Sequence, residues 1–178
     1  ISDRYFSSVL GPTFPNRSYL LAATSFGHLS NGEVVPDPSK LPGLVYQPIT
    51  GTIFDLLDQH SVAWAYYFSD GPHGASFRNY LADPQHFRLF DKSVLTQLPL
   101  DVQALYTTVF GSMHSFMEDA AAGTLPSVAF VDAASGVFNP AAENDEHPGS
   151  DIRAGQSFVA QVVHAVRTSP NWGDSILF

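Results

Sequence analysis

A threonine follows a Gly-Pro break and precedes a helical pattern near the start of this chain. The stretch reads Gly11-Pro12-Thr13-Phe14-Pro15-Asn16-Arg17. Proline suits the first turn of a helix because its φ is fixed and an N–H there would lack a partner. The free N–H groups and dipole of such a turn favour an anion such as phosphate. Two interpretations of Thr13 therefore stay open: a hydroxyl beside an anion site, or an ordinary helix N-cap.

A histidine surrounded by carboxylates is the second candidate. It lies in the run Glu143-Asn144-Asp145-Glu146-His147-Pro148. Neighbouring carboxylates orient an imidazole and favour its charged form, which suits protonation of a leaving alkoxide or stabilisation of phosphoryl oxygens. The alternative is an acidic surface loop with an incidental histidine. We expect the carboxylates to set His147 and shape the loop rather than to bind metal directly.

Alternating helical and strand patterns predict the elements that must position these residues. We expect helices over 15–25, 52–58 and 112–122 and from Asp151 to Pro170, and strands over 62–68 and 127–132 and from Ser175. The last helix presents an apolar face made of Ile152, Phe158, Val159, Val162, Val163 and Val166. This alternation predicts an α/β fold with a mostly parallel sheet, covered by helices on both faces.

Two segments break the alternation. Residues 28–51 are rich in Pro and Gly and predict a long surface loop, with a small hairpin near Asn31-Gly32. Residues 69–111 predict an excursion or small subdomain, with short helical pieces over 77–81 and 85–90. Ligands of parallel sheets lie at the carboxyl ends of strands, so we expect the Thr13 loop and the loop after Val131 to meet across one cleft.

Composition excludes several classes of partner. The chain has 178 residues and a net charge of −9, with only eight Lys and Arg, which argues against nucleic acid and against electrostatic adhesion to anionic membranes. It has no cysteine, so disulfides and thiolate metal sites are excluded. We expect no transmembrane segment, because no apolar run approaches the roughly 20 residues that cross a bilayer.

Several motifs together resemble the phosphoesterase family of the alkaline-phosphatase-like superfamily, which includes non-specific phospholipases C and acid phosphatases. They occur in the family's order and cover nearly the whole chain. The first motif is 11–17 followed by Ala23-Thr24-Ser25, and the second is the link from Asp119 to Pro126. The third is 143–148, followed by Asp151-Ile152 and Gly155-Gln156. The last is Ser169-Pro170-x-Trp172-x-Asp174-Ser175.

The resemblance implies roles for four residues. It implies that Thr13, coordinated to a divalent metal ion, attacks phosphorus to give a phospho-threonine that water hydrolyses. Asn16 is expected either to donate its amide to a phosphate oxygen or to stabilise the turn. His147 is expected to act on the same phosphate group. His114 is a weaker second phosphate-site candidate, with a core or surface histidine as the alternative; the remaining histidines show no partner pattern.

The resemblance also implies segments that this sequence does not contain. Relatives carry an earlier Glu-Asn-x-Ser-Phe-Asp and a later Tyr-Asp-Glu-His-Gly-Gly segment, so only the Thr13 hydroxyl remains of the metal ligands. We expect residues 1–178 to be the central part of a single catalytic domain, incomplete at both ends and completed by the remainder of that domain. A secreted or periplasmic location is favoured by the resemblance.

The expected substrate is a phospholipid or a small phosphate ester. We favour phospholipase C activity, with an acid phosphatase or a non-catalytic phosphate-ester-binding module as alternatives. Aromatic residues in the less regular segments either line a lipid-accepting cleft or pack a small subdomain: Tyr46, Phe77, Tyr80, Phe87 and Phe90.

Overall fold

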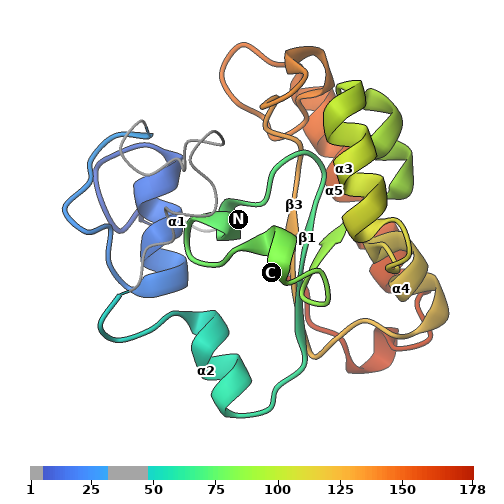
Figure 1. Ribbon diagram of the computed structural model, residues 1–178, viewed down its shortest axis with the longest axis horizontal. Helices are drawn as coiled ribbons and strands as arrows, with labels where there is room; N and C mark the ends of the chain where they lie inside the picture. The colour runs from blue at the N-terminus through green and yellow to red at the C-terminus, as the bar shows by residue number, and fades with distance from the viewer. Residues whose placement is uncertain (1–5, 32–47) are drawn as a thin grey trace. The chain divides into compact units, whose positions relative to one another are not determined.

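The computed structural model describes residues 6–31 and 48–178, which form two compact units (Figure 1). Unit 1 comprises the described part of residues 1–62 together with His73–Asn79, and unit 2 comprises Ala63–Pro72 and Tyr80–Phe178. The expected excursion over 69–111 is therefore divided between the two units. Most of the expected 28–51 loop, its hairpin and Tyr46 lie outside the described residues.

Unit 1 is built from short helices. Helix α1 spans Thr13–Ala22, α2 spans Ile53–Gln59, and a 3-10 helix spans His73–Ser76. The α2 prediction is confirmed because Thr52 and Asp55 form a reciprocal capping box, in which each side chain accepts from the other's backbone N–H. Helix α1 starts two residues earlier than expected and stops sooner, where Ala23 turns into the left-handed region at φ 57°.

Unit 2 contains a three-stranded parallel sheet in the order β2-β1-β3. The central strand β1 spans Trp64–Phe68 and is buried throughout, as expected for a strand covered on both faces. Strand β2 spans Phe87–Leu89, and β3 spans Val128–Asp132. Tyr66 stacks on the rings of both neighbouring strands, with centroids 5.6 Å from each. The predicted α/β class and parallel sheet are confirmed.

Helices pack on this sheet according to the alternation of β1. Helices α4, Phe116–Ala122, and α5, Ile152–Thr168, share an apolar cluster with Ala65 and Tyr67. Phe68 points the other way and meets Tyr106 and Phe110 of α3, which spans Leu100–Phe110. Figure 1 labels these three helices beside β1 and β3.

The expected apolar face of α5 is only partly buried. Phe158, Val162 and Val166 belong to the core, whereas Ile152 and Val159 are 57% and 54% exposed. No described helix is both long and apolar enough to cross a bilayer.

Four expectations about the elements are wrong in whole or in part. Residues 85–90 contain strand β2, because Phe87 and Leu89 alternate into the core around Arg88. Of the 77–81 piece, only Tyr80 and Leu81 are helical, in a 3-10 turn over Tyr80–Ala82, and another 3-10 turn precedes the piece at His73–Ser76. The 112–122 helix begins only at Phe116, where Ser115 supplies a capping box with Glu118. No strand follows Ser175 among the described residues.

Candidate active site

Thr13 is the first residue of α1, in unit 1. Pro12 occupies the N-cap position and no side chain caps the helix, so the N-cap interpretation of Thr13 is wrong. The Phe14 N–H donates to Asn31 Oδ1 at 3.0 Å. Neither the hydroxyl nor the N–H of Thr13 makes a hydrogen bond within residues 6–31 and 48–178. A half-buried hydroxyl with open lone pairs thus lies at the positive end of a ten-residue helix.

Asn16 holds the backbone that leads into α1. Its Nδ2 donates to the carbonyls of Val9, Gly11 and Pro12 at 3.2, 3.0 and 3.0 Å, and its Oδ1 accepts from Val9 N at 3.0 Å. Two roles were open for Asn16, and its contacts in the structure are those of the turn-stabilising role. A phosphate contact by Asn16 stays a prediction.

His73 is a neighbour of this helix turn that sequence reasoning did not single out. Its ring lies 4.7 Å from the ring of Phe14, centroid to centroid, and is only 9% exposed as a residue. No spacing pattern could have revealed it, because the contact joins residues 59 positions apart and depends on the packing of the His73–Ser76 turn against α1.

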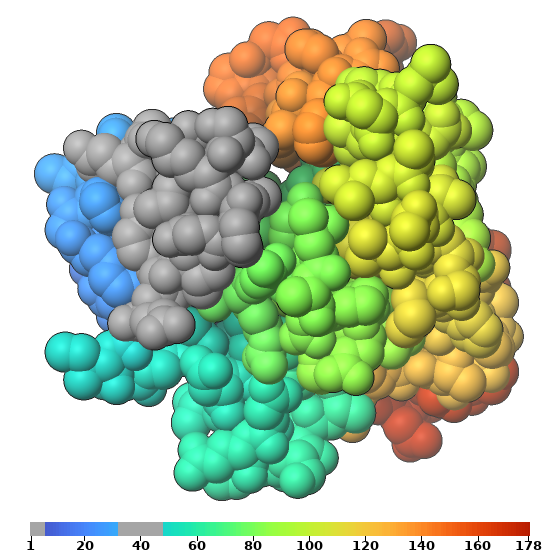
Figure 2. Space-filling view, in the orientation of Figure 1, coloured from blue at the N-terminus to red at the C-terminus, as the bar shows by residue number. Residues whose placement is uncertain are grey.

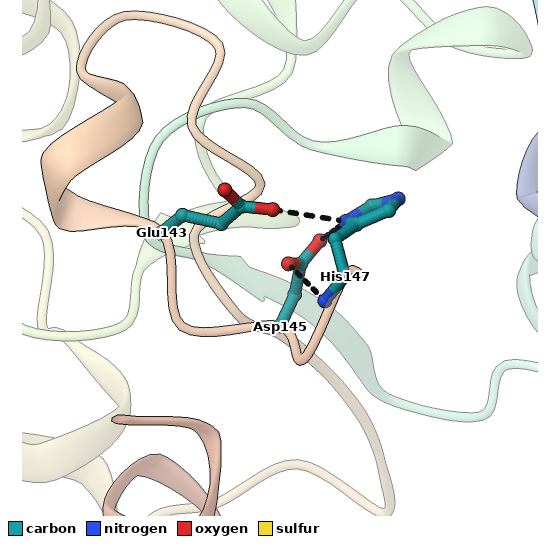
Figure 3. Close-up of side chains that lie close together, drawn as sticks. All are labelled: Glu143, Asp145 and His147. Atoms are coloured by element: carbon teal, nitrogen blue, oxygen red, sulfur yellow. Dashed lines mark hydrogen bonds and ion pairs between the residues drawn. The ribbon is translucent and has the colours of Figure 1, made fainter. Parts of the chain in front are cut away.

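His147 lies in a loop of unit 2 with two carboxylates around its Nδ1 atom (Figure 3). Nδ1 is 2.7 Å from Asp145 Oδ2 and 3.3 Å from Glu143 Oε1. The short contact to Asp145 is poorly aligned for a hydrogen bond, so it places the carboxylate beside the ring without forming one. The His147 side chain is 42% exposed and those carboxylates are 12% and 21% exposed, which leaves the imidazole reachable.

The His147 loop is attached to the sheet and to α5. Asn144 donates its N–H to the Ala134 carbonyl at 3.0 Å and accepts from Ala134 N–H at 2.7 Å through its own side chain. Glu146 adopts φ 62°, in the left-handed region. Its side chain lies directly over Gly155 of α5, where an added Cβ would be 2.2 Å from Glu146 Cγ. The glycine at position 155 thus leaves space for the Glu146 side chain, and its role is not to make the helix backbone flexible.

Two places offer ligands to a divalent metal ion. Glu143, Asp145 and His147 each present an oxygen or nitrogen, all within 4.8 Å of one another, and three such ligands with an open position fit a catalytic metal. Their present contacts equally serve to orient the imidazole, as the sequence analysis expects. The unbonded Thr13 hydroxyl is the other fitting donor.

His114 is engaged by a buried carboxylate. Its Nδ1 lies 3.2 Å from Asp119 Oδ1, and its own side chain is 60% exposed. Asp119 also accepts from Tyr67, Arg88 and Thr124 at 2.7, 2.7 and 2.8 Å. This arrangement is that of a surface histidine beside a structural network, the alternative that the sequence left open. A phosphate role for His114 stays a prediction.

The network controls the ionisation of Asp119. Burial raises the pKa of this carboxyl group, but hydrogen bonds from Tyr67 and Thr124 and the charge of Arg88 outweigh burial, so the pKa is lowered. Burial, with the neighbouring carboxylate, raises the pKa of Tyr67. Asp119 is therefore an anion held in the core by its donors.

Of the aromatic residues expected to line a cleft, two pack the core of unit 2. Tyr80 and Phe87 are buried among other rings, and Phe77 is buried in unit 1. Phe90 is buried but also lines a cavity. Thr13 belongs to unit 1 and His147 to unit 2, so their meeting across one cleft stays a prediction.

The parallel sheet and its helices define an α/β protein, with candidate side chains at the start of α1 and in the His147 loop. The model of the phosphoesterase family matches residues 1–178, and the chain belongs to this family. Similar proteins from Arabidopsis thaliana include non-specific phospholipase C6, at 29% identity over 99% of this chain, and non-specific phospholipase C1, at 31% over 99%. Non-specific phospholipase C4 is 31% identical over 100%. The chain spans 29%, 28% and 28% of the length of these relatives.

Proposed function

We propose that the full-length protein hydrolyses phosphoric esters in the manner of a phospholipase C, with Thr13 as the nucleophile. The observation that carries the proposal is the hydroxyl at the first position of α1, which makes no hydrogen bond within residues 6–31 and 48–178. The N-terminus of that helix favours an anion. Residues 6–31 also contain Arg17 and no Asp or Glu, so no carboxylate of this segment repels a phosphate.

The proposed reaction has two displacements at phosphorus. Thr13 Oγ1 forms a bond to phosphorus while the bond from phosphorus to the alcohol oxygen breaks. Water then forms a bond to this phosphorus while the bond from phosphorus to Thr13 Oγ1 breaks, so that a proton from the water restores the Thr13 hydroxyl and the phosphate product leaves. His147, oriented by Asp145 and Glu143, gives its proton to the departing alkoxide.

A divalent metal ion is part of the proposal. Bound to the Thr13 hydroxyl, it would favour the alkoxide and offset charge on the phosphoryl group. Glu143, Asp145 and His147 form the other donor set that fits such an ion.

The proposed substrate is a phospholipid, because the similar proteins are named non-specific phospholipases C. An acid phosphatase and a non-catalytic phosphate-ester-binding module remain the alternatives. Turnover of p-nitrophenylphosphorylcholine against p-nitrophenyl phosphate distinguishes them, measured on the metal-supplied protein. Preference for the monoester would favour the phosphatase, and turnover of neither by a folded protein would favour the binding module. A secreted or periplasmic location is proposed on the resemblance alone.

Thr13→Ala tests the nucleophile directly. Removing a catalytic nucleophile costs on the order of 10⁴-fold or more in kcat, whereas loss of a hydroxyl that makes no hydrogen bond leaves folding nearly unchanged. Thr13→Ser is the matched control, because it keeps the hydroxyl and should retain activity. Wild-type turnover by a folded Thr13→Ala protein would remove Thr13 from the mechanism.

A further inference from the structure

Unit 2 contains a cavity of about 160 Å³ beyond the carboxyl ends of its three strands. Asp70 follows β1, Phe90 and Asp91 follow β2, and Ala134 follows β3. Figure 2 shows the yellow-green part of the chain, around residue 100, beside the orange part, around residue 140, and residues from both regions line the cavity. Ligands of parallel sheets bind at this end of the strands, yet neither Thr13 nor His147 lines the cavity.

The charge of the lining is negative. Among the residues that the structure describes, the cavity is bordered by Asp70 and Asp91 and by no Lys, Arg or His. Asp91 Oδ1 accepts from Ser93 N–H at 2.8 Å, and Oδ2 has no hydrogen bond among the described residues. The adjacent Lys92 is paired with Glu118 at 3.0 Å and does not neutralise Asp91. An anion such as phosphate is therefore disfavoured here.

Asp70 is a buried carboxyl group. It is 6% exposed and accepts from the N–H groups of Gly71, Ser135 and Val137 at 2.8, 3.2 and 2.9 Å. Burial raises its pKa, and the backbone hydrogen bonds oppose this only in part. A positive charge in the cavity would offset the cost of holding this anion away from water.

The rest of the lining includes aromatic rings and amides, together with small polar and aliphatic side chains. Phe90 and Phe158 are buried and lie 4.8 Å apart, centroid to centroid, while Phe138 is half-buried. Aromatic rings attract cations through their π faces, and they bind quaternary ammonium groups in particular. The amides of Asn139 and Gln161 can hydrogen-bond a polar tail without adding charge.

We propose that this cavity binds a small organic cation, an ammonium or quaternary ammonium group. Its volume is below the roughly 300–1,000 Å³ of pockets for drug-sized ligands, and it holds about five waters at roughly 30 Å³ each. That room suits a headgroup amine or a free amine of the same chemistry. Aromatic walls favour such a group over a hydrated metal ion, which needs several oxygen ligands.

Binding is measured on the full-length Thr13→Ala protein, so the test does not depend on turnover. The probes are choline, its neutral isostere 3,3-dimethylbutan-1-ol, and monomeric phosphocholine esters, each titrated by calorimetry. We expect choline to bind at least tenfold more tightly than the neutral isostere. If the phosphocholine ester binds more tightly than choline, the cavity is assigned to a lipid headgroup. If choline binds more tightly, the cavity is assigned to a free amine. Both results support a cation site.

Two pairs of variants test the location. Gln161→Lys places a positive charge at the exposed rim of the cavity and should weaken choline at least tenfold, whereas Gln156→Lys on the same helix, outside the lining, should not. Asp91→Asn keeps the Oδ1 acceptor but removes the charge and should also weaken choline, whereas Asp101→Asn on α3 should not.

The proposal is overturned if choline does not bind, or if the neutral isostere binds equally well. It is also overturned if Gln161→Lys and Gln156→Lys behave alike. Gln161 is exposed on a helix, where lysine is well tolerated, so this pair remains informative even if Asp91→Asn fails to fold.

Discussion

Asn16, in the first turn of α1, and Asn144, in the His147 loop, each fix a neighbouring segment of backbone, but their surroundings differ in charge. Each pairs with both the N–H and the carbonyl of one distant residue, Val9 in unit 1 and Ala134 in unit 2. Around Asn16 the segment 6–31 has no carboxylate, and the Thr13 hydroxyl stays unbonded. Around Asn144, two carboxylates approach His147 within 3.3 Å.

Because of this difference, we expect the two regions to have different roles in the reaction. A neutral loop at a helix N-terminus is suited to receive an anion, because nothing negative competes with the ligand. A loop that places two carboxylates beside an imidazole is suited to orient that ring for proton transfer. The phosphoryl group is therefore expected at Thr13 and the proton at His147.

The largest effect that tests this difference in roles is expected for His147→Gln. Loss of a general acid costs about 10²–10⁴-fold in kcat, and more for poor leaving groups, which need the proton most. We expect slow release of an alkyl alcohol and milder slowing with p-nitrophenol esters, measured as a series of leaving groups. Equal slowing across the series would contradict a proton-donor role.

The two asparagines should respond differently to an isosteric change. Asn16 uses its amide as donor to three carbonyls, so Asn16→Asp loses those bonds and faces the carbonyls with a carboxylate; we expect about 1–3 kcal/mol of lost stability. The Asn144 side chain acts only as an acceptor in the Ala134 pair, so Asn144→Asp should cost less. Urea unfolding of both variants gives the comparison, and equal losses would contradict the distinction.

Gly155→Ala should disturb the His147 loop alone. The new methyl group would collide with Glu146, and overpacking costs about 1–3 kcal/mol, partly offset by about 1 kcal/mol of better helix propensity. Turnover should fall while α1 is unaffected. The double variant Gly155→Ala with Glu146→Ala removes the clash and should recover activity; no recovery would show that Gly155 acts in another way.

The smallest effect concerns the pH dependence of stability. The pKa of Asp119 is lowered in the folded state from an ordinary value of 3.8, so its stabilisation is present above about pH 4 and is lost as the pH falls through the folded-state pKa. Hydrogen exchange should show earlier loss of protection in α4 than in α1, whose segment 6–31 has no carboxyl group. Asp119→Asn should flatten this acid dependence. Parallel loss in both helices would contradict the comparison.

The elements that sequence reasoning found are those with strong local signals. The capping boxes of α2 and α4, the apolar runs of β1 and β3, and the N-cap Asp151 of α5 all act within a few residues. Helix α3 was missed because its apolar residues lie on several sides, with Leu100 83% exposed and only Tyr106 and Phe110 buried. Strand β2 is three residues long and depends on pairing with β1.

The candidate residues of the site could be singled out from local motifs in the same way, and their roles stay predictions. Thr13 and His147 were recognisable because their motifs are contiguous in sequence. The Phe14–His73 contact, the Asn144–Ala134 pair and the close approach of Glu146 to Gly155 join separate segments, so only the folded chain reveals them.

The central claim is that phosphorus becomes bonded to Thr13, and the direct measurement is mass spectrometry after rapid acid quenching. The full-length protein, supplied with metal, would be mixed with p-nitrophenylphosphorylcholine or p-nitrophenyl phosphate and then digested. The account predicts a phosphocholine or phosphate adduct on the peptide that contains Thr13, and none in Thr13→Ala. An adduct on another residue, or steady turnover by a folded Thr13→Ala protein, would contradict it.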